Sequence, residues 1–401
     1  MTSRQRIEAA INRKPVDRIP VDFGGTPETG IAAVAYQALR KRLGLSQGPV
    51  RLFDVNQQLA IVEPAARERA GSDCVLLALQ CKRWRPWTLP DGSPCEVPAA
   101  WKPVRGEDGS DTVIGPTGAP LLRRLPGAYW FSPAGPLVPG LDSAADIPRF
   151  MPHIRIMDRP AYLDESLHDL AERARTLHHE TDYAIVGHFG GHIFAASQLL
   201  RGMGNFMCDL VADKPFARAL MEALADQHMA EFEHYIEALG PYIQVIALAD
   251  DLGSQRGPQI SLALFREMVR PPMERLYQHI KKRTSAKLFL HSCGSVAALI
   301  PDLIEMGVDI LNPVQVSAAD MDTARLKREF GSELTFWGGG CDTQHILPFG
   351  TPQQVGDEVR RRIDDLGPEG FVFAQVHNIQ PGVAPANMLA MWDAAREFGA
   401  A

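Results

Sequence analysis

The residues of this chain best suited to chemistry are one histidine and two cysteines. His291 and Cys293 stand two residues apart, and Cys341 follows at the end of the glycine run Gly338-Gly339-Gly340. One imidazole nitrogen and two thiolate sulfurs are donors that Zn²⁺ favours, and three protein ligands leave a position open for a reacting group. We therefore predict that His291, Cys293 and Cys341 bind a catalytic metal ion.

The surrounding sequence decides whether these residues can meet. A free cysteine is commonly just a small buried side chain, so each one alone is weak evidence. Here each group ends an apolar run that predicts a buried strand, Lys287-Leu288-Phe289-Leu290 and Leu334-Thr335-Phe336-Trp337. If these two strands are neighbours, all three donors come together at one end of a sheet.

Composition restricts the class of protein. The chain has 401 residues, 45% of them hydrophobic and 22% charged, with a net charge of −7. These values are typical of a globular protein with a full core, and they argue against nucleic acid or an anionic membrane surface as a partner. Six cysteines are too few for a disulfide framework at this length. With no signal peptide or membrane span expected, we predict a cytoplasmic protein.

The apolar runs predict a (β/α)₈ barrel. Runs that are apolar throughout, rather than alternating, indicate parallel strands covered on both faces. Eight of them occur, the number that closes a barrel of this type. They lie at 18–23, 74–79, 183–188, 243–248, 287–290, 308–311, 334–337 and 371–374.

Helices are predicted between these runs, and their ends carry typical signals. We expect helices near 3–12, 262–282, 295–306 and 321–330. Thr351-Pro352 and Gly367 mark the start and the end of another helix. Residues from about 81 to 141 are rich in proline, glycine and tryptophan and do not fit the alternation. We interpret them as an insertion over the barrel mouth within one domain spanning 1–401.

In a barrel of this kind, the loops after the strands build the active site. Asp250-Asp251 follows one strand, where paired carboxylates can bind a metal, orient a histidine or transfer protons. The same pair could instead cap a helix. His377 follows the last strand and could contact a substrate or cap that strand. The residues predicted to bind substrate are Asp22, His192, Asp250 and Gln315.

Other candidates stay open on sequence alone. Asp342 and His345 could supply a further contact to the metal or lie in a solvated loop. His188 could pack or contact a ligand. The tryptophans of the insertion could line an aromatic binding site or pack within it.

With these motifs in view, the chain resembles the uroporphyrinogen decarboxylase superfamily over most of its length. The matching segments are 6–10, 15–20, 249–253, 291–294, 307–315, 339–343 and 377–381. The resemblance implies a (β/α)₈ barrel. True decarboxylases of the superfamily carry an arginine-bearing segment after the first strand, which grips the substrate carboxylates. This chain has Val21-Asp22-Phe23-Gly24-Gly25-Thr26 there, without arginine.

The other branch of the superfamily consists of cobamide-dependent methyltransferases, which use His-x-Cys and a distant cysteine as zinc ligands. The resemblance therefore implies a zinc- and corrinoid-dependent methyltransferase. Its donor would be a small methoxylated compound, aromatic ones included, and Asp251 or His377 would relay a proton to the leaving oxygen. The chain lacks an Asp-x-His-x-x-Gly corrinoid motif, since Phe289 stands where the aspartate would be. The corrinoid (cobalamin) is then expected on a separate partner protein.

Three alternatives remain at this stage. The enzyme could methylate a thiol from a methylcobamide, act as a porphyrinogen decarboxylase, or be a non-catalytic corrinoid- or metal-binding protein. Barrels of this superfamily occur as monomers and as dimers, so a homodimer is one expected state.

Overall fold

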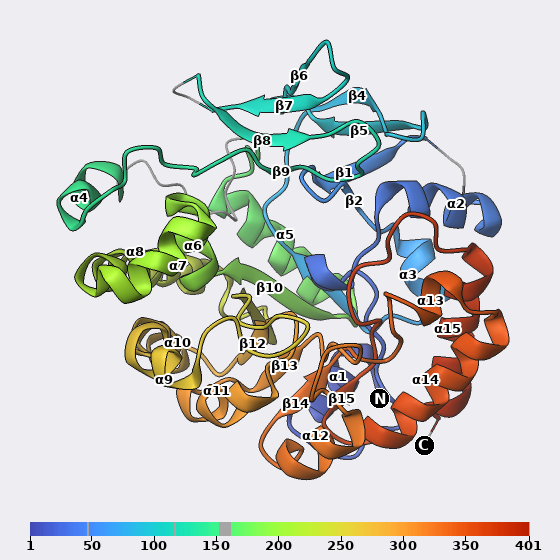
Figure 1. Cartoon of the computed structure of the whole chain (residues 1–401). Coiled ribbons are helices and arrows are strands. Elements are labelled where there is room, and N and C mark those ends of the chain that lie inside the picture. The colour runs from blue at the N-terminus through green and yellow to red at the C-terminus, as the bar shows by residue number, and fades with distance from the viewer. Residues whose placement is uncertain (46–47, 116–117, 152–161, 401) are drawn as a thin grey trace.

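A ring of parallel strands forms the centre of the molecule. The computed structural model describes residues 1–45, 48–115, 118–151 and 162–400. Val21 bridges in parallel to Ser72, just before the first strand of the sheet, and to Phe373, just after the last, so this segment closes the ring. The predicted (β/α)₈ barrel is confirmed (Figure 1). Its other strands, in spatial order, are β3 (Cys74–Leu77), β10 (Ala184–Gly190), β11 (Val245–Ala249), β12 (Lys287–His291), β13 (Ile310–Asn312), β14 (Thr335–Trp337) and β15 (Phe371–Val372).

Side chains fill the inside of the barrel, and a helix covers one end. Val186, Phe289 and Trp337 point inward and share a buried cluster with Ile7 and Ile11 of α1 (Ser3–Ile11). The amide of Arg4 donates to the backbone carbonyl of Asp182, just before β10, so α1 lies at the amino ends of the strands. The carboxyl ends at the opposite side remain for a functional site.

A layer of helices surrounds the sheet, and a second apolar core lies between them. Among the described helices, none is both long and apolar enough to cross a membrane. The helices of this layer are α2 (Ala33–Leu43), α3 (Pro64–Ala70), α5 (Leu167–Glu180), α8 (Lys214–Leu239), α10 (Arg270–Lys281), α11 (Ile300–Met306), α12 (Thr323–Phe330), α14 (Pro352–Leu366) and α15 (Pro385–Phe398). Shorter helices near the loops are α4 (Ile147–Phe150), α6 (Phe194–Arg201), α7 (Met203–Ala212), α9 (Leu262–Leu264) and α13 (Ile346–Phe349).

The predicted helix signals are found where expected, with one interruption. Thr351 caps α14 in a capping box, and Gly367 follows its last residue. The helix predicted over 262–282 is divided by a π-helical turn at Phe265–Val269. Two prolines at the start of α10 lack the amide protons that regular helical bonds would need, which explains a local change of hydrogen bonding there.

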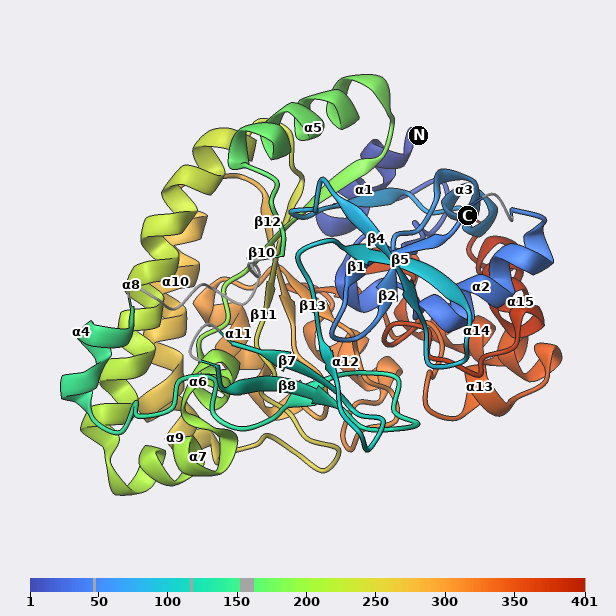
Figure 2. The same cartoon turned by 90° about the horizontal axis from the view of Figure 1, so that it is seen from above.

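The insertion contributes to two small sheets, and both lie at one side of the ring of helices (Figures 1 and 2). Trp101 packs edge to face against both Trp87 and Phe131, so these three rings pack within the insertion. The first sheet also recruits two strands that we did not predict, from residues 50–60. Its strands are β2 (Leu59–Ala60), β1 (Val50–Asp54), β5 (Pro94–Pro98) and β4 (Trp84–Thr88). The second contains β6 (Val104–Arg105), β7 (Asp111–Ile114), β8 (Pro120–Arg124) and β9 (Ser132–Pro133).

Candidate metal centre

Two loops at the carboxyl ends of β11 and β12 are joined by hydrogen bonds and form the base of the site. The amide of Asp250 donates to the carbonyl of His291 at 2.9 Å, and the amide of Leu252 donates to Oγ of Ser292 at 2.9 Å. Gly294 has a φ of +89°, and a Cβ there would lie 2.6 Å from the backbone of Gly253. Only glycine allows this approach, which fixes the position of Cys293 between the two loops.

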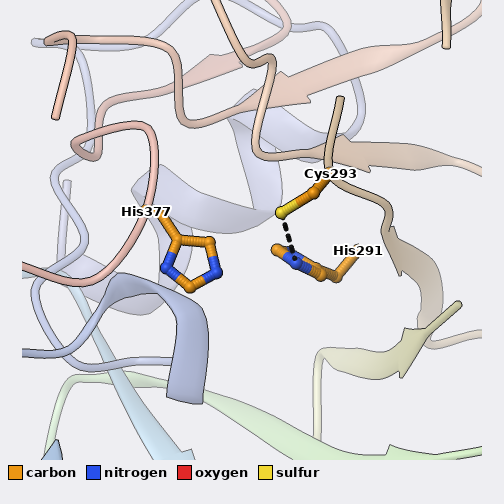
Figure 3. A group of neighbouring side chains, drawn as sticks. All are labelled: His291, Cys293 and His377. Carbon is orange, nitrogen blue, oxygen red and sulfur yellow. Dashed lines mark hydrogen bonds between the residues drawn. The ribbon is translucent and has the colours of Figure 1, made fainter. Parts of the chain in front are cut away.

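Three side chains converge above these loops. A nitrogen of His291, the sulfur of Cys293 and a nitrogen of His377 lie within 4.8 Å of one another (Figure 3). Cys293 Sγ is 3.3 Å from His291 Nε2, and the rings of His291 and His377 are 5.5 Å apart. His291 ends β12, whereas His377 follows β15, so the curvature of the barrel brings the two together. One sulfur and two imidazole nitrogens form a donor set that suits Zn²⁺, with room for a fourth ligand.

Asn312, at the end of β13, determines which nitrogen of His291 faces the group. Its Nδ2 donates to the carbonyl of Trp337 at 2.7 Å, so its Oδ1 must face His291, whose Nδ1 lies 2.6 Å away. The amide oxygen can only accept, and Nδ1 therefore carries the proton. In the neutral ring, Nε2 is therefore the nitrogen with the lone pair, and it faces Cys293 and His377, as a metal ligand requires.

The negative charge of the Cys293 thiolate and the positive charge of protonated His291 stabilise each other. Burial by itself would raise the pKa of Cys293, but the imidazoles of His291 and His377 outweigh it and lower the pKa to about 7. Burial by itself would lower the pKa of His291, but the Cys293 thiolate and the carboxylate of Glu28 raise it well above its usual range. The cysteine is thus readily available as a thiolate, the form that binds metals.

Cys341 does not join this group. Its side chain is fully buried in the core between sheet and helices. Burial raises the pKa of its thiol well above its usual range, and the carboxylate of Glu358 on α14 adds to the effect. The positive φ angles of Gly338 and Gly339 turn the chain before Cys341. In place of the predicted Cys341, the structure brings His377 to His291 and Cys293.

The strands predicted to be neighbours are also separated. β13 lies between β12 and β14, and it pairs with both of them. The condition under which we expected the three donors to meet, that these two strands are neighbours, is therefore not fulfilled. Two further candidates near Cys341, Asp342 and His345, contact each other at 2.9 Å, and the His345 side chain is 70% exposed.

The two adjacent carboxylates after β11 have different surroundings. Asp251 Oδ1 accepts the amide of Cys293 at 2.8 Å and lies 3.9 Å from His291 Nε2, so this side chain borders the donor group. Asp250 is buried, and its oxygens accept three backbone amides at the start of α6, from residues 193–195, at 2.6–2.8 Å. Asp250 thus caps a helix, the alternative that the sequence had left open.

The remaining predicted substrate-binding residues have different surroundings. Asp22 is fully buried inside the barrel, where it accepts Trp337 Nε1 at 2.8 Å. Gln315 accepts the amide of Gly294 at 2.8 Å and so supports the loop that carries Cys293. His192 lies next to the α6 start, and its carbonyl is 2.8 Å from Nε2 of His228.

Sequence reasoning missed Glu28, which lies in the 3₁₀ turn Pro27–Thr29 after the first strand. Burial by itself would raise its pKa, but the imidazoles of His291 and His188 lower it. Glu28 is thus a carboxylate that faces the histidines of the site. Its position after a strand end was the signal available, although no motif marked it.

Comparison with known proteins agrees with this architecture. The family model for uroporphyrinogen decarboxylase (URO-D) matches residues 141–398, more than half of the chain, so the chain belongs to this family. A methyltransferase from Methanosarcina mazei has a similar structure, with a TM-score of 0.61 at 18% identity over 99% of both chains. A B12-independent methionine synthase from Shewanella sp. W3-18-1 matches with a TM-score of 0.38 at 12% identity, over 96% of this chain and 94% of its own. No curated protein sequence matches the chain.

Proposed function

We propose that the protein is a zinc-dependent methyltransferase that moves a methyl group from a small methoxylated compound to a reduced corrinoid carried by a partner protein. The observation that carries the proposal is the convergence of His291, Cys293 and His377 at the barrel mouth in a chain of this family. Bound there, zinc would act as a Lewis acid on the ether oxygen of the donor.

The side chains of the site fit the needs of this reaction. The C–O bond of the donor breaks, the methyl group passes to the nucleophile, and the leaving oxygen must take up a proton. Asp251, whose side chain is 51% exposed and borders the donor group, can pass that proton from solvent to the oxygen. Asn312 holds His291 in the tautomer that binds metal, which leaves Nε2 for coordination.

The charges argue against the family's decarboxylase chemistry. A porphyrinogen substrate carries many carboxylates, which need cationic partners. Here Glu28 and Asp251 are the carboxylates beside the donor group, and residues 21–26 contain no arginine. An anionic site of this kind favours a neutral donor.

Metal analysis combined with a transfer assay tests the proposal. The wild-type protein, Cys293→Ser and His377→Ala are loaded with zinc, freed of excess metal and analysed for zinc per chain. Each is then mixed with methoxyarenes and reduced cobalamin, and formation of methylcobalamin is followed by absorbance. We expect about one zinc and methyl transfer in the wild type, with both strongly reduced in the variants.

Other outcomes would identify the alternatives. A wild type that binds no zinc would sink the proposal and favour decarboxylation. A zinc protein that leaves methoxyarenes untouched but demethylates methylcobalamin with a thiol would be a thiol methyltransferase. Zinc binding without turnover of either kind would favour a non-catalytic metal-binding protein.

A further inference from the structure

A groove opens beside the donor group, on the side of α6 and α7. It encloses about 450 Å³, a volume in the range of small-molecule sites. One wall is formed by Gly135 and Pro136. This segment is held beside α6 by a hydrogen bond from the amide of Leu137 to the carbonyl of Leu199 at 2.9 Å. The insertion therefore contributes to a cavity at the barrel mouth.

Asp251 belongs both to this groove and to the border of the donor group. Asp251 is among the residues that line the groove, while its Oδ1 accepts the amide of Cys293 at 2.8 Å. Gln259 continues the floor, with its Nε2 donating to the carbonyl of Asp251 at 3.0 Å and its Oε1 accepting from Gln198 at 2.9 Å. A molecule in the groove would thus lie one side chain away from His291 and Cys293.

The groove is mostly apolar and has little positive charge. Leu199, Met203 and Pro136 supply apolar surface, and Gly202 adds bare backbone where a Cβ would meet Pro136 at 3.1 Å. Flat backbone and a methionine sulfur both suit contact with an aromatic ring. Among the residues that line it, Asp251 is the one with a formal charge.

The positive charge of the arginine near this groove is neutralised by two aspartates. Arg201, at the end of α6, is paired with Asp142 at 2.7 Å and with Asp209 at 2.9 Å. A carboxylate in the groove would therefore face Asp251 without an arginine to pair with, and like charges at short range repel. Among the described residues, Asp251 Oδ2 accepts no hydrogen bond, so it is available to carry the proton that the leaving oxygen takes up.

We propose that this groove binds the methyl donor, an uncharged methoxyarene about one ring in size, with its methoxy oxygen toward Asp251. This assignment rests on the proposed function, since it specifies the substrate class of the same site. It names Met203 and Asp251 as the residues that decide specificity, by shape and by charge.

Ligand binding to the zinc-loaded full-length protein tests this by calorimetry, without a corrinoid. The probes are 4-methoxyphenol and 4-methoxybenzoate. Met203→Trp fills the groove, whereas Val211→Trp places the same ring on the same helix at a position that is 69% exposed and does not line the groove. Thermal unfolding of both variants checks that they fold.

We expect 4-methoxyphenol to bind the wild type and Val211→Trp equally, and Met203→Trp at least about tenfold more weakly. We expect 4-methoxybenzoate to bind the wild type at least about tenfold more weakly than 4-methoxyphenol. In Asp251→Asn, the difference in affinity between the two probes should become smaller. Equal binding of the phenol to both tryptophan variants, or equal binding of the two probes to the wild type, would overturn the assignment.

The same variants, assayed also for methyl transfer to reduced cobalamin, separate this inference from the proposed function. Binding of the phenol that Met203→Trp abolishes, without any methyl transfer to reduced cobalamin, supports the groove and contradicts the function. Methyl transfer from 4-methoxyphenol that Met203→Trp leaves unchanged supports the function and contradicts the groove.

Discussion

Asn312 Oδ1 lies 2.6 Å from His291 Nδ1, and this contact sets the orientation of the whole donor group. The amide cannot rotate, because its other end donates to the carbonyl of Trp337 on the neighbouring strand. The barrel itself, through two adjacent strands, therefore determines which nitrogen of His291 is presented beside Cys293. A residue with no metal-binding role of its own thereby prepares the site for a metal.

Replacing Asn312 by alanine should weaken zinc binding by about 10–100-fold, because Nδ1 of His291 loses its acceptor and the ring loses its fixed orientation. A competition titration with a coloured chelator measures this. Asn312→Asp keeps an acceptor oxygen and should retain most of the affinity. Equal zinc affinity in wild type and Asn312→Ala would show that the contact does not orient the ligand.

His377 and Cys341 should respond oppositely to substitution. His377→Ala removes a member of the donor group and should lower zinc content strongly, whereas Cys341→Ala should keep it, because that thiol lies in the core beside α14. The loss of a small buried group should cost Cys341→Ala about 1 kcal/mol of stability. Zinc analysis and urea unfolding measure both effects. A Cys341→Ala protein that folds but binds no zinc would restore the ligand set expected from sequence.

The sequence was sufficient for the barrel because apolar runs and punctuation are local signals. It also placed His291 and Cys293 close together, since His291 ends one strand and Cys293 follows it. It could not decide between Cys341 and His377, because both follow strands. Their directions depend on the positive φ angles at Gly338 and Gly339 and on the curvature of the sheet. Glu28 was missed for a similar reason, because only the closed ring brings its loop to the histidines.

Asp22 should make stability depend on pH. Burial raises its pKa to about 6, above its ordinary value of 3.8, despite the hydrogen bond from Trp337. The folded state then binds more protons between these values, so the stabilisation is full below about pH 4 and is lost as pH rises to about 6. The side chain at position 22 cannot ionise in Asp22→Asn. As the pH rises over this range, the free energy of unfolding of this variant should therefore fall by on the order of 2 kcal/mol less than that of the wild type.

Urea unfolding of both proteins at several pH values between about 4.5 and 6.5 tests this. The substitution also changes hydrogen bonds, but that effect does not vary with pH. Parallel curves for the two proteins would mean that Asp22 does not titrate in this window.

Gly294 should tolerate no side chain, whereas a nearby glycine should accept one. A Cβ at Gly294 would meet the backbone of Gly253 at 2.6 Å and of Ser254 at 2.7 Å, and its φ of +89° strains any other residue. Gly294→Ala should therefore cost at least about 1–2 kcal/mol and push the two loops apart, which displaces Cys293. Gly257→Ala is the matched control in the same loop region, since its Cβ would meet nothing within 4 Å. Zinc content and urea unfolding should change in Gly294→Ala and stay near wild type in Gly257→Ala. If Gly294→Ala instead keeps both properties, the loops can separate without disturbing the donor group, and their close contact is not what positions Cys293.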